Sequence, residues 1–176
     1  AGAVAIFELC AVGGTLTMVA HFFAVSLCLK RCFGEQATEA LVEAAGAAFE
    51  SFSREDDIVL KDEALVTGAL MATLIGHETI PFTTLERVSL RPGATTRNTL
   101  TLLDSLLGGL SALMGPDRLV EKLTEEPASF MDLFPADHPA AAKFAQDRLR
   151  DMRLHRLAEH PNFEMAHSLS DDDDDP

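Results

Sequence analysis

The sequence contains no tryptophan and no tyrosine, and phenylalanine supplies all eleven of its aromatic side chains. Tryptophan and tyrosine favour membrane interfaces and the centres of protein interfaces, because one end of each side chain is apolar and the other is polar. A membrane segment in this chain would therefore lack the usual aromatic belt.

Basic residues are also scarce. The chain has 14 lysines and arginines against 28 aspartates and glutamates, which leaves a net charge of −14. The negative phosphate backbone of a nucleic acid repels such a chain. We therefore expect no nucleic acid among its partners.

Motifs that indicate catalysis or cofactor binding are missing. The sequence has no Gly-x-Ser-x-Gly, no glycine-rich phosphate loop followed by lysine, and no pair of Cys-x-x-Cys motifs. His155 and His160 flank Glu159, but histidines five residues apart point about 140° away from each other around a helix. We expect no zinc site there, and we predict a protein that is not an enzyme and has no cofactor or metal.

An uncharged apolar run dominates the N-terminal part of the chain. Before Lys30 the acidic and basic side chains are Glu8 and His21 alone. A helix needs about 20 apolar residues to cross a bilayer. A signal peptide would carry its positive charges ahead of the apolar run, whereas here they follow it. We predict a membrane-spanning helix over residues 1–33, a helical domain over 34–160 and an acidic tail over 161–176.

Small residues give this predicted helix a packing face. Gly13 and Gly14 allow another helix to approach closely, which is how helices associate in a membrane. Ala20 and Ala24 repeat the small-residue spacing further along the helix. By the positive-inside rule, Lys30 and the arginine after it would lie on the cytoplasmic, matrix or stromal side, together with the domain that follows.

His21 lies deep in the predicted span, where an ionisable group is costly and often functional. One interpretation is a ligand of haem or metal, or a contact to a quinone or a proton relay. The other is a neutral imidazole bonded to a neighbouring helix, because neutral imidazole is far cheaper to bury than a charge. Glu8 lies near the helix end and would reach the membrane interface.

Three cysteines, Cys10, Cys28 and Cys32, lie in or beside the apolar run. An odd number clustered in this way does not indicate the disulfide framework of a secreted domain. Cys28 and Cys32 are four residues apart and would share one face of a helix, so they form a candidate thiol pair. Alternatively they are small residues in a packed helix, since free cysteine behaves as a small hydrophobic residue.

The rest of the chain has the apolar periodicity of a helical domain. We expect helices at 35–52, 61–75, 81–90, 99–114, 118–125 and 139–159. Thr83 and Glu86 have the spacing of a capping box, and Asn98 is placed to cap the helix after it. Gly108 and Gly109, inside the leucine-rich helix, indicate close packing. Because no alternating β-branched run exceeds four or five residues, the predicted fold class is all-α.

Residues 48–65 resemble an EF-hand. Phe49 and Phe52 match the paired phenylalanines in the entering helix of that family. Loop positions one, three, five, eight and twelve fall on Ser53, Glu55, Asp57, Val59 and Glu63. This alignment requires a one-residue deletion in the loop, at the glycine that the EF-hand family needs for its sharp turn. The resemblance implies a helix-loop-helix scaffold that has lost calcium binding. The alternative is a charged loop that joins two helices.

An uninterrupted acidic run lies close to the C-terminus, comprising Asp171, Asp172, Asp173, Asp174 and Asp175. Such a run either stays solvated as a solubilising tail or docks against lysine and arginine of a neighbouring subunit. Both interpretations remain open from the sequence.

Together these features favour a non-catalytic accessory subunit of a multi-subunit membrane complex, with the lipid bilayer and the other subunits as its partners. The chain begins at Ala1 without methionine, so we expect a removed targeting peptide. With the acidic domain and the single anchor, we expect the mitochondrial inner membrane and a respiratory or other energy-converting complex. The alternative is a soluble regulatory module of calcium-sensor type, with residues 1–32 buried in its own core or in a partner's groove.

Overall fold

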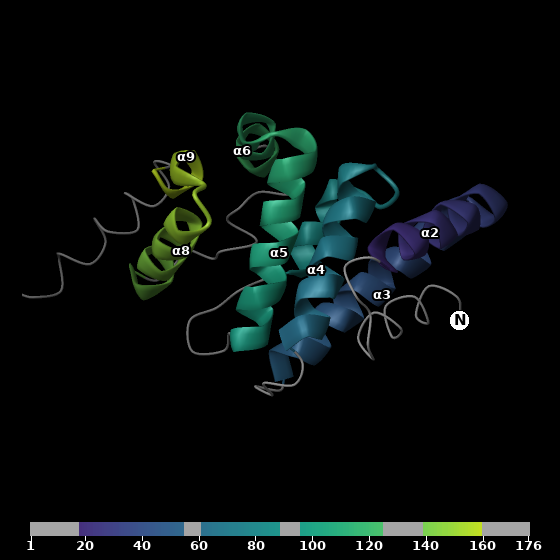
Figure 1. The fold of residues 1–176 in the computed structure, drawn as a ribbon, viewed down its shortest axis with the longest axis horizontal. Helices are drawn as coiled ribbons and strands as arrows, with labels where there is room; N and C mark the ends of the chain where they lie inside the picture. The colour runs from purple at the N-terminus through teal and green to yellow at the C-terminus, as the bar shows by residue number, and fades with distance from the viewer. Residues whose placement is uncertain (1–17, 55–60, 89–95, 125–138, 160–176) are drawn as a thin grey trace, which may run out of the picture.

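The computed structural model describes residues 18–54, 61–88, 96–124 and 139–159, and the regular elements in these ranges are all helices joined by short turns (Figure 1). The elements are α2 (Val19–Phe33), α3 (Glu35–Arg54), α4 (Lys61–Gly76), the 3₁₀ helix η3 (Phe82–Arg87), α5 (Arg97–Met114), α6 (Pro116–Thr124), α8 (Pro139–Asp151) and α9 (His155–Ala158). No strand occurs in the described residues, and the predicted all-α class is confirmed.

The centre of the domain is the pair α4 and α5, which pack side by side (Figure 1). Leu70, Met71 and Leu74 of α4 are fully buried. α5 contributes the buried side chains of Leu102, Leu103, Leu106, Leu107 and Leu110. α4 also contacts α2 and α3, so it is apolar around most of its circumference rather than along one stripe.

Glycine allows the backbones of α4 and α5 to approach closely. A Cβ on Gly68 would collide with the carbonyl oxygen of Leu102 and lie 2.9 Å from Cβ of Ser105. Ser105 Oγ in turn donates a hydrogen bond to the Leu65 carbonyl oxygen at 2.6 Å. These contacts fix how the two central helices lie along each other.

The close packing expected for Gly108 and Gly109 holds for one of the two. A Cβ on Gly109 would lie 2.7 Å from Cβ of Ala72, whereas a Cβ on Gly108 would have no atom within 4 Å. Gly109 therefore faces α4, and Gly108 points to open space. The sequence prediction was wrong for Gly108, because adjacent helical residues point about 100° apart.

The cap of α5 is Thr96 rather than Asn98. Thr96 has an extended backbone, and its Oγ1 accepts a hydrogen bond from the Thr99 amide at 3.1 Å. The same hydroxyl donates to the Phe52 carbonyl oxygen at 2.8 Å, which ties the start of α5 to the end of α3. Asn98 is buried within the first turn. The sequence prediction was wrong because both residue types are good caps and only the tertiary contact distinguishes them.

The capping box predicted for Thr83 and Glu86 is also absent from the described structure. η3 begins after Pro81, which has no side-chain cap, and Thr84 Oγ1 donates to the Pro81 carbonyl oxygen at 2.6 Å. A six-residue 3₁₀ helix has a tighter turn than the α-helix that a capping box starts.

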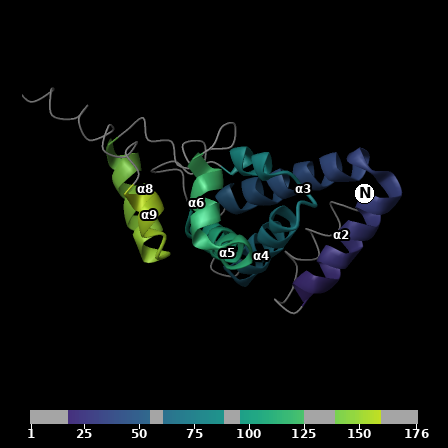
Figure 2. The same cartoon turned by 90° about the horizontal axis from the view of Figure 1, so that it is seen from above.

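α2 belongs to the domain on one of its faces. It ends at Gly34, whose φ of 57° turns the chain into α3, and α3 leads away at an angle (Figure 2). Val19, Phe22 and Ser26 are buried where α2 meets α3 and α4. No helix in the described residues is both long and apolar enough to cross a membrane. The span predicted over residues 1–33 is therefore unsupported by α2, and residues 1–17 lie outside the described residues.

The predicted helix 139–159 is two helices. Arg153 adopts a φ of 61°, the Leu154 amide donates to the Leu149 carbonyl oxygen at 2.8 Å, and the Arg153 amide donates to that of Arg150 at 2.9 Å. This is a Schellman motif, and it includes the buried apolar pair Leu149 and Leu154. The sequence concealed the break, because arginine occupies the position where glycine is usual.

Replacement of Gly68 by alanine tests the close approach of α4 and α5. We expect Gly68→Ala to lower the free energy of unfolding by about 1–3 kcal/mol, because the new methyl group meets backbone atoms that cannot move aside. The matched control is Gly108→Ala in the same helix pair. We expect this variant to raise the free energy of unfolding by about 0.5–1 kcal/mol, because alanine leaves the unfolded chain less backbone entropy to lose on folding. Denaturant unfolding measures both, and two changes of the same sign would contradict this packing.

Candidate functional site

Lys30 of α2 binds the backbone at the C-terminal end of α4. That helix ends in a second Schellman motif, in which Glu78 has a φ of 56° and the Thr79 amide donates to the Leu74 carbonyl oxygen at 2.8 Å. Lys30 Nζ donates to the carbonyl oxygens of Glu78, at 2.6 Å, and Thr79, at 3.0 Å. A cation is favoured there because the C-terminal end of a helix carries partial negative charge.

A ring contact lies at the same junction between α2 and α4. The rings of Phe23 and His77 have centroids 4.8 Å apart and planes tilted by 32°. Together with Lys30, this contact holds one side of α2 against α4. Local sequence patterns do not reveal this junction, because the partners lie more than 40 residues apart along the chain.

The opposite side of α2 carries exposed side chains in a regular row. We call this row the α2 seam, and it consists of Met18, His21, Val25, Cys28 and Cys32. Their spacing alternates between three and four residues, which is the a and d pattern of a helix that packs against another helix. Within the row, Met18 is 39% exposed and Val25 is 48% exposed; Phe33, at the end of α2 and outside the row, is 61% exposed. The seam is thus an apolar helix face without a partner in the described residues.

The predicted packing and ligand residues have different outcomes. Ala20 and Ala24 are exposed on α2, beside the seam. Gly13, Gly14 and the acidic run 171–175 lie outside the described residues. His21 is exposed rather than buried, and no group of three or more histidines, cysteines or acidic residues in the described residues could hold a metal ion.

The EF-hand resemblance stays a prediction. Ser53 belongs to the last turn of α3 and Glu63 to the first turn of α4. Glu55, Asp57 and Val59 lie outside the described residues. α3 and α4 follow each other along the chain, as the two helices of the resemblance would.

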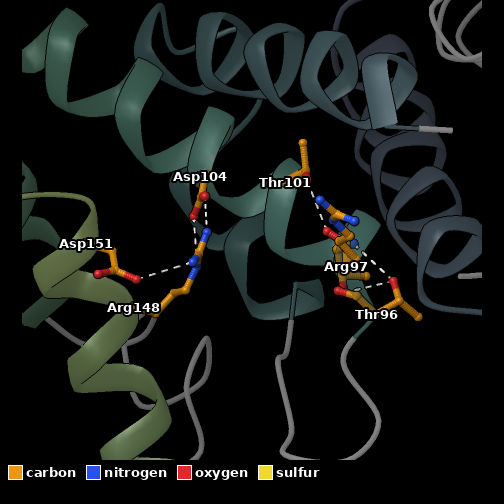
Figure 3. A network of polar contacts seen from close by, with 7 residues as sticks. Thr96, Arg97, Thr101, Asp104, Arg148 and Asp151 are labelled. Carbon is orange, nitrogen blue, oxygen red and sulfur yellow. Dashed lines mark hydrogen bonds and ion pairs between the residues drawn. The ribbon is translucent and has the colours of Figure 1, made fainter. Parts of the chain in front are cut away.

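A polar groove lies between α5 and α8 (Figure 3). Arg148 Nε donates to Asp104 Oδ1 at 3.1 Å, and Nη2 of the same guanidinium pairs with Asp104 Oδ2. Nη1 lies 3.5 Å from Asp151 Oδ2. The hollow beside this pair has a volume of about 590 Å³ and is further lined by Leu65, Arg97, Leu100, Thr101 and Ser105. A guanidinium with two carboxylate partners orders α8 against α5.

The charge state of Asp104 depends on its surroundings. Burial raises the pKa of its carboxyl above the ordinary value, and the Asp151 charge also raises it. The charge and hydrogen bond of Arg148 lower the pKa, but the net effect of all these contributions is a raised pKa. The pair fits a structural link, since both hydroxyls that line the groove are engaged with the backbone: Ser105 donates to the Leu65 carbonyl oxygen and Thr101 to that of Arg97.

A smaller hollow of about 250 Å³ lies between the end of α4, η3 and α6. Its lining includes Arg118, Lys122 and Phe82. Lys122 Nζ lies 5.9 Å from the centroid of the Phe82 ring, a distance at which cation and ring attract.

No known protein family matches this sequence, and no curated protein matches it. Function is therefore argued from the surfaces described above. Of these, the α2 seam has the exposed apolar character of an interaction surface, whereas the groove at Asp104 is occupied by its own ion pair.

Replacement of Lys30 by methionine tests the junction of α2 and α4. We expect Lys30→Met to lower the free energy of unfolding by about 1 kcal/mol, because two carbonyl oxygens lose a charged donor that is partly screened by solvent. The neighbouring exposed Arg31 is the control, and Arg31→Met should change it by less than about 0.5 kcal/mol. Equal effects from the two variants in denaturant unfolding would contradict the contact.

The ion pair predicts a specific pH dependence. Because the pKa of Asp104 is raised in the folded state, its protonation stabilises that state below the ordinary pKa, and this contribution is lost as pH rises through the raised pKa. Asp104→Asn should abolish this loss. Arg148→Met should raise the pKa of Asp104 further, because it removes the nearby positive charge. Carboxyl NMR titration measures the pKa, and a lower value in Arg148→Met would refute this account.

Proposed function

We propose that this protein is a non-catalytic accessory subunit of a membrane complex, and that it joins its neighbours through its N-terminal apolar segment and the α2 seam. The observation that carries the proposal is the exposure of Met18, Val25 and Phe33 on α2. These are three of the four large hydrophobic side chains exposed in the described residues. An apolar surface concentrated on one helix is typical of a surface that binds another protein or a membrane.

The other face of α2 supports the same proposal. Val19 and Phe22 pack into the domain, and Lys30 bonds to the end of α4. α2 is thus held in place from one side, and the seam projects from the other. A surface that is already ordered loses less entropy on binding, so it binds more tightly for the same contacts.

The sequence supplies the rest of the proposal. Residues 12–29 contain no charged side chain and lead directly through the seam. The strongly acidic chain suits a basic neighbour, and the run 171–175 is the segment that we expect to contact one. The mitochondrial inner membrane and an energy-converting complex are proposed as the setting on the sequence evidence alone.

A second candidate function is a soluble regulatory module of calcium-sensor type. The packing of Val19, Phe22 and Ser26 against α3 and α4 favours it, because in this alternative the N-terminal segment belongs to the protein's own core. The succession of α3 and α4 along the chain is also compatible with the resemblance. Calorimetric titration of the full chain with Ca²⁺ tests this version, and absence of heat together with an unchanged melting temperature would remove it.

Alkaline extraction of membranes distinguishes the two candidates. We expect the full chain to stay in the membrane pellet at high pH and to co-purify with other subunits after gentle detergent extraction. Val25→Asp should reduce that co-purification by at least about tenfold, because a carboxylate at an apolar interface loses hydration without gaining a partner. The control is Ala47→Asp, an exposed position on α3, which should leave co-purification unchanged.

Release of the unmodified chain into the alkaline supernatant would overturn the membrane assignment and favour the soluble module. An equal effect of Val25→Asp and Ala47→Asp would show that the seam is not the contact surface. Circular dichroism of both variants would show whether the helices remain intact.

A further inference from the structure

Two free thiols, Cys28 and Cys32, lie exposed on the last turns of α2. They are one helical turn apart, and side chains at this spacing point in the same direction. Their Cβ atoms on a helix are about 5–6 Å apart, which is too far for an unstrained disulfide between them. The same spacing is the one at which a helix offers two ligands to a single metal ion.

The described residues supply only half of a metal site here. Structural zinc is bound by four ligands in tetrahedral geometry, and four cysteine thiolates are a common set. In the described residues no cluster of three or more histidine, cysteine or acidic side chains surrounds a possible ion. The two thiols therefore need two more ligands from outside the described residues.

The α2 seam indicates where those ligands come from. Cys28 and Cys32 occupy consecutive positions of the seam, after Val25. The spacing of the seam is that of a helix that packs against an identical helix in a coiled coil. Two copies whose α2 helices run parallel, with a twofold axis along the seam, place Cys28 beside Cys28 and Cys32 beside Cys32. Symmetry then brings four thiols together, two from each copy, in adjacent layers of the interface. An unrelated partner would complete the site only if it carried two thiols at the matching positions.

The neighbouring charges suit such a site. A divalent ion bound by four thiolates carries net negative charge. Arg31 is exposed between the two cysteines and would offset this charge from both copies. Lys30 is bonded to carbonyl oxygens on the other side of α2, so it leaves the thiol face open.

We propose that Cys28 and Cys32 form half of a tetrathiolate site for a thiophilic divalent ion such as Zn²⁺, completed by the same residues of a second copy packed along the α2 seam. This inference rests on the proposed function, in which a neighbouring protein covers the α2 seam, and it names a second copy of the chain as that neighbour. Each thiol releases its proton to the solvent as the ion binds, and no oxidation is involved.

The test titrates the full chain with Cd²⁺ and, separately, with Zn²⁺ in the presence of a reductant that does not bind metals. We expect a thiolate-to-cadmium ultraviolet absorption band that saturates at one ion per two chains. Light scattering should show the mass doubling with either ion, and a chelator should reverse it. A mass that stays monomeric, or saturation at one ion per chain, would overturn the proposal.

Variants assign the ligands. Cys28→Ser and Cys32→Ser should each weaken binding by more than the roughly 10- to 100-fold that loss of an outer-shell contact costs, because each removes two of four ligands. Cys10→Ser is the control and should leave the affinity and the stoichiometry unchanged. If this control weakens binding as much as the α2 thiol variants do, the four-thiolate set is wrong. A dimer that responds to reductant and not to metal also refutes it.

The two proposals fail separately. A chain that stays in the alkaline pellet but forms no metal-dependent dimer would lose this inference and keep the proposed function. A chain that dimerises with metal but leaves the membrane would lose the membrane role, and the tetrathiolate site would stand.

Discussion

The close approach of α4 and α5 is the contact on which the remaining structure depends. Gly68 leaves no space between its own backbone and the Leu102 carbonyl oxygen, and Ser105 ties the same two helices by a hydrogen bond to Leu65. Backbones this close bury the leucines of both helices without a large void. α2 and α3 then pack on the remaining sides of α4, so the position of every neighbouring helix follows from this one crossing.

The C-terminal end of α4 determines how α2 is oriented at the surface of the domain. The Schellman motif at Glu78 turns two carbonyl oxygens toward Lys30, and this bond sets the side of α2 that faces the domain. The seam with Cys28 and Cys32 is the opposite side as a direct consequence. A buried helix crossing thus decides which exposed residues are available to a partner.

Several features were predictable from the sequence because they depend on local periodicity. The helices at 35–52, 61–75 and 99–114 agree with α3, α4 and α5 to within a few residues at their ends. The caps and breaks were less predictable, because Thr96 caps α5 although asparagine is the better cap in isolation, and because Arg153 occupies a backbone conformation that usually requires glycine. For the site, the sequence identified the thiol pair but not its exposure, and it placed His21 in a buried setting where the structure has it exposed.

The sequence by itself determined the all-helical class, the acidic charge and the apolar character of the N-terminal segment, since each follows from residue type and spacing along the chain. Tertiary structure alone decided that one side of α2 packs on α4 while Val25 and the two thiols remain outside. The physical reason is that an apolar residue gains nearly the same free energy in any dry environment. Hydropathy therefore shows that a helix must be covered. Which element covers it is shown only by tertiary contacts, such as the hydrogen bonds from Lys30 to the carbonyl oxygens at the end of α4.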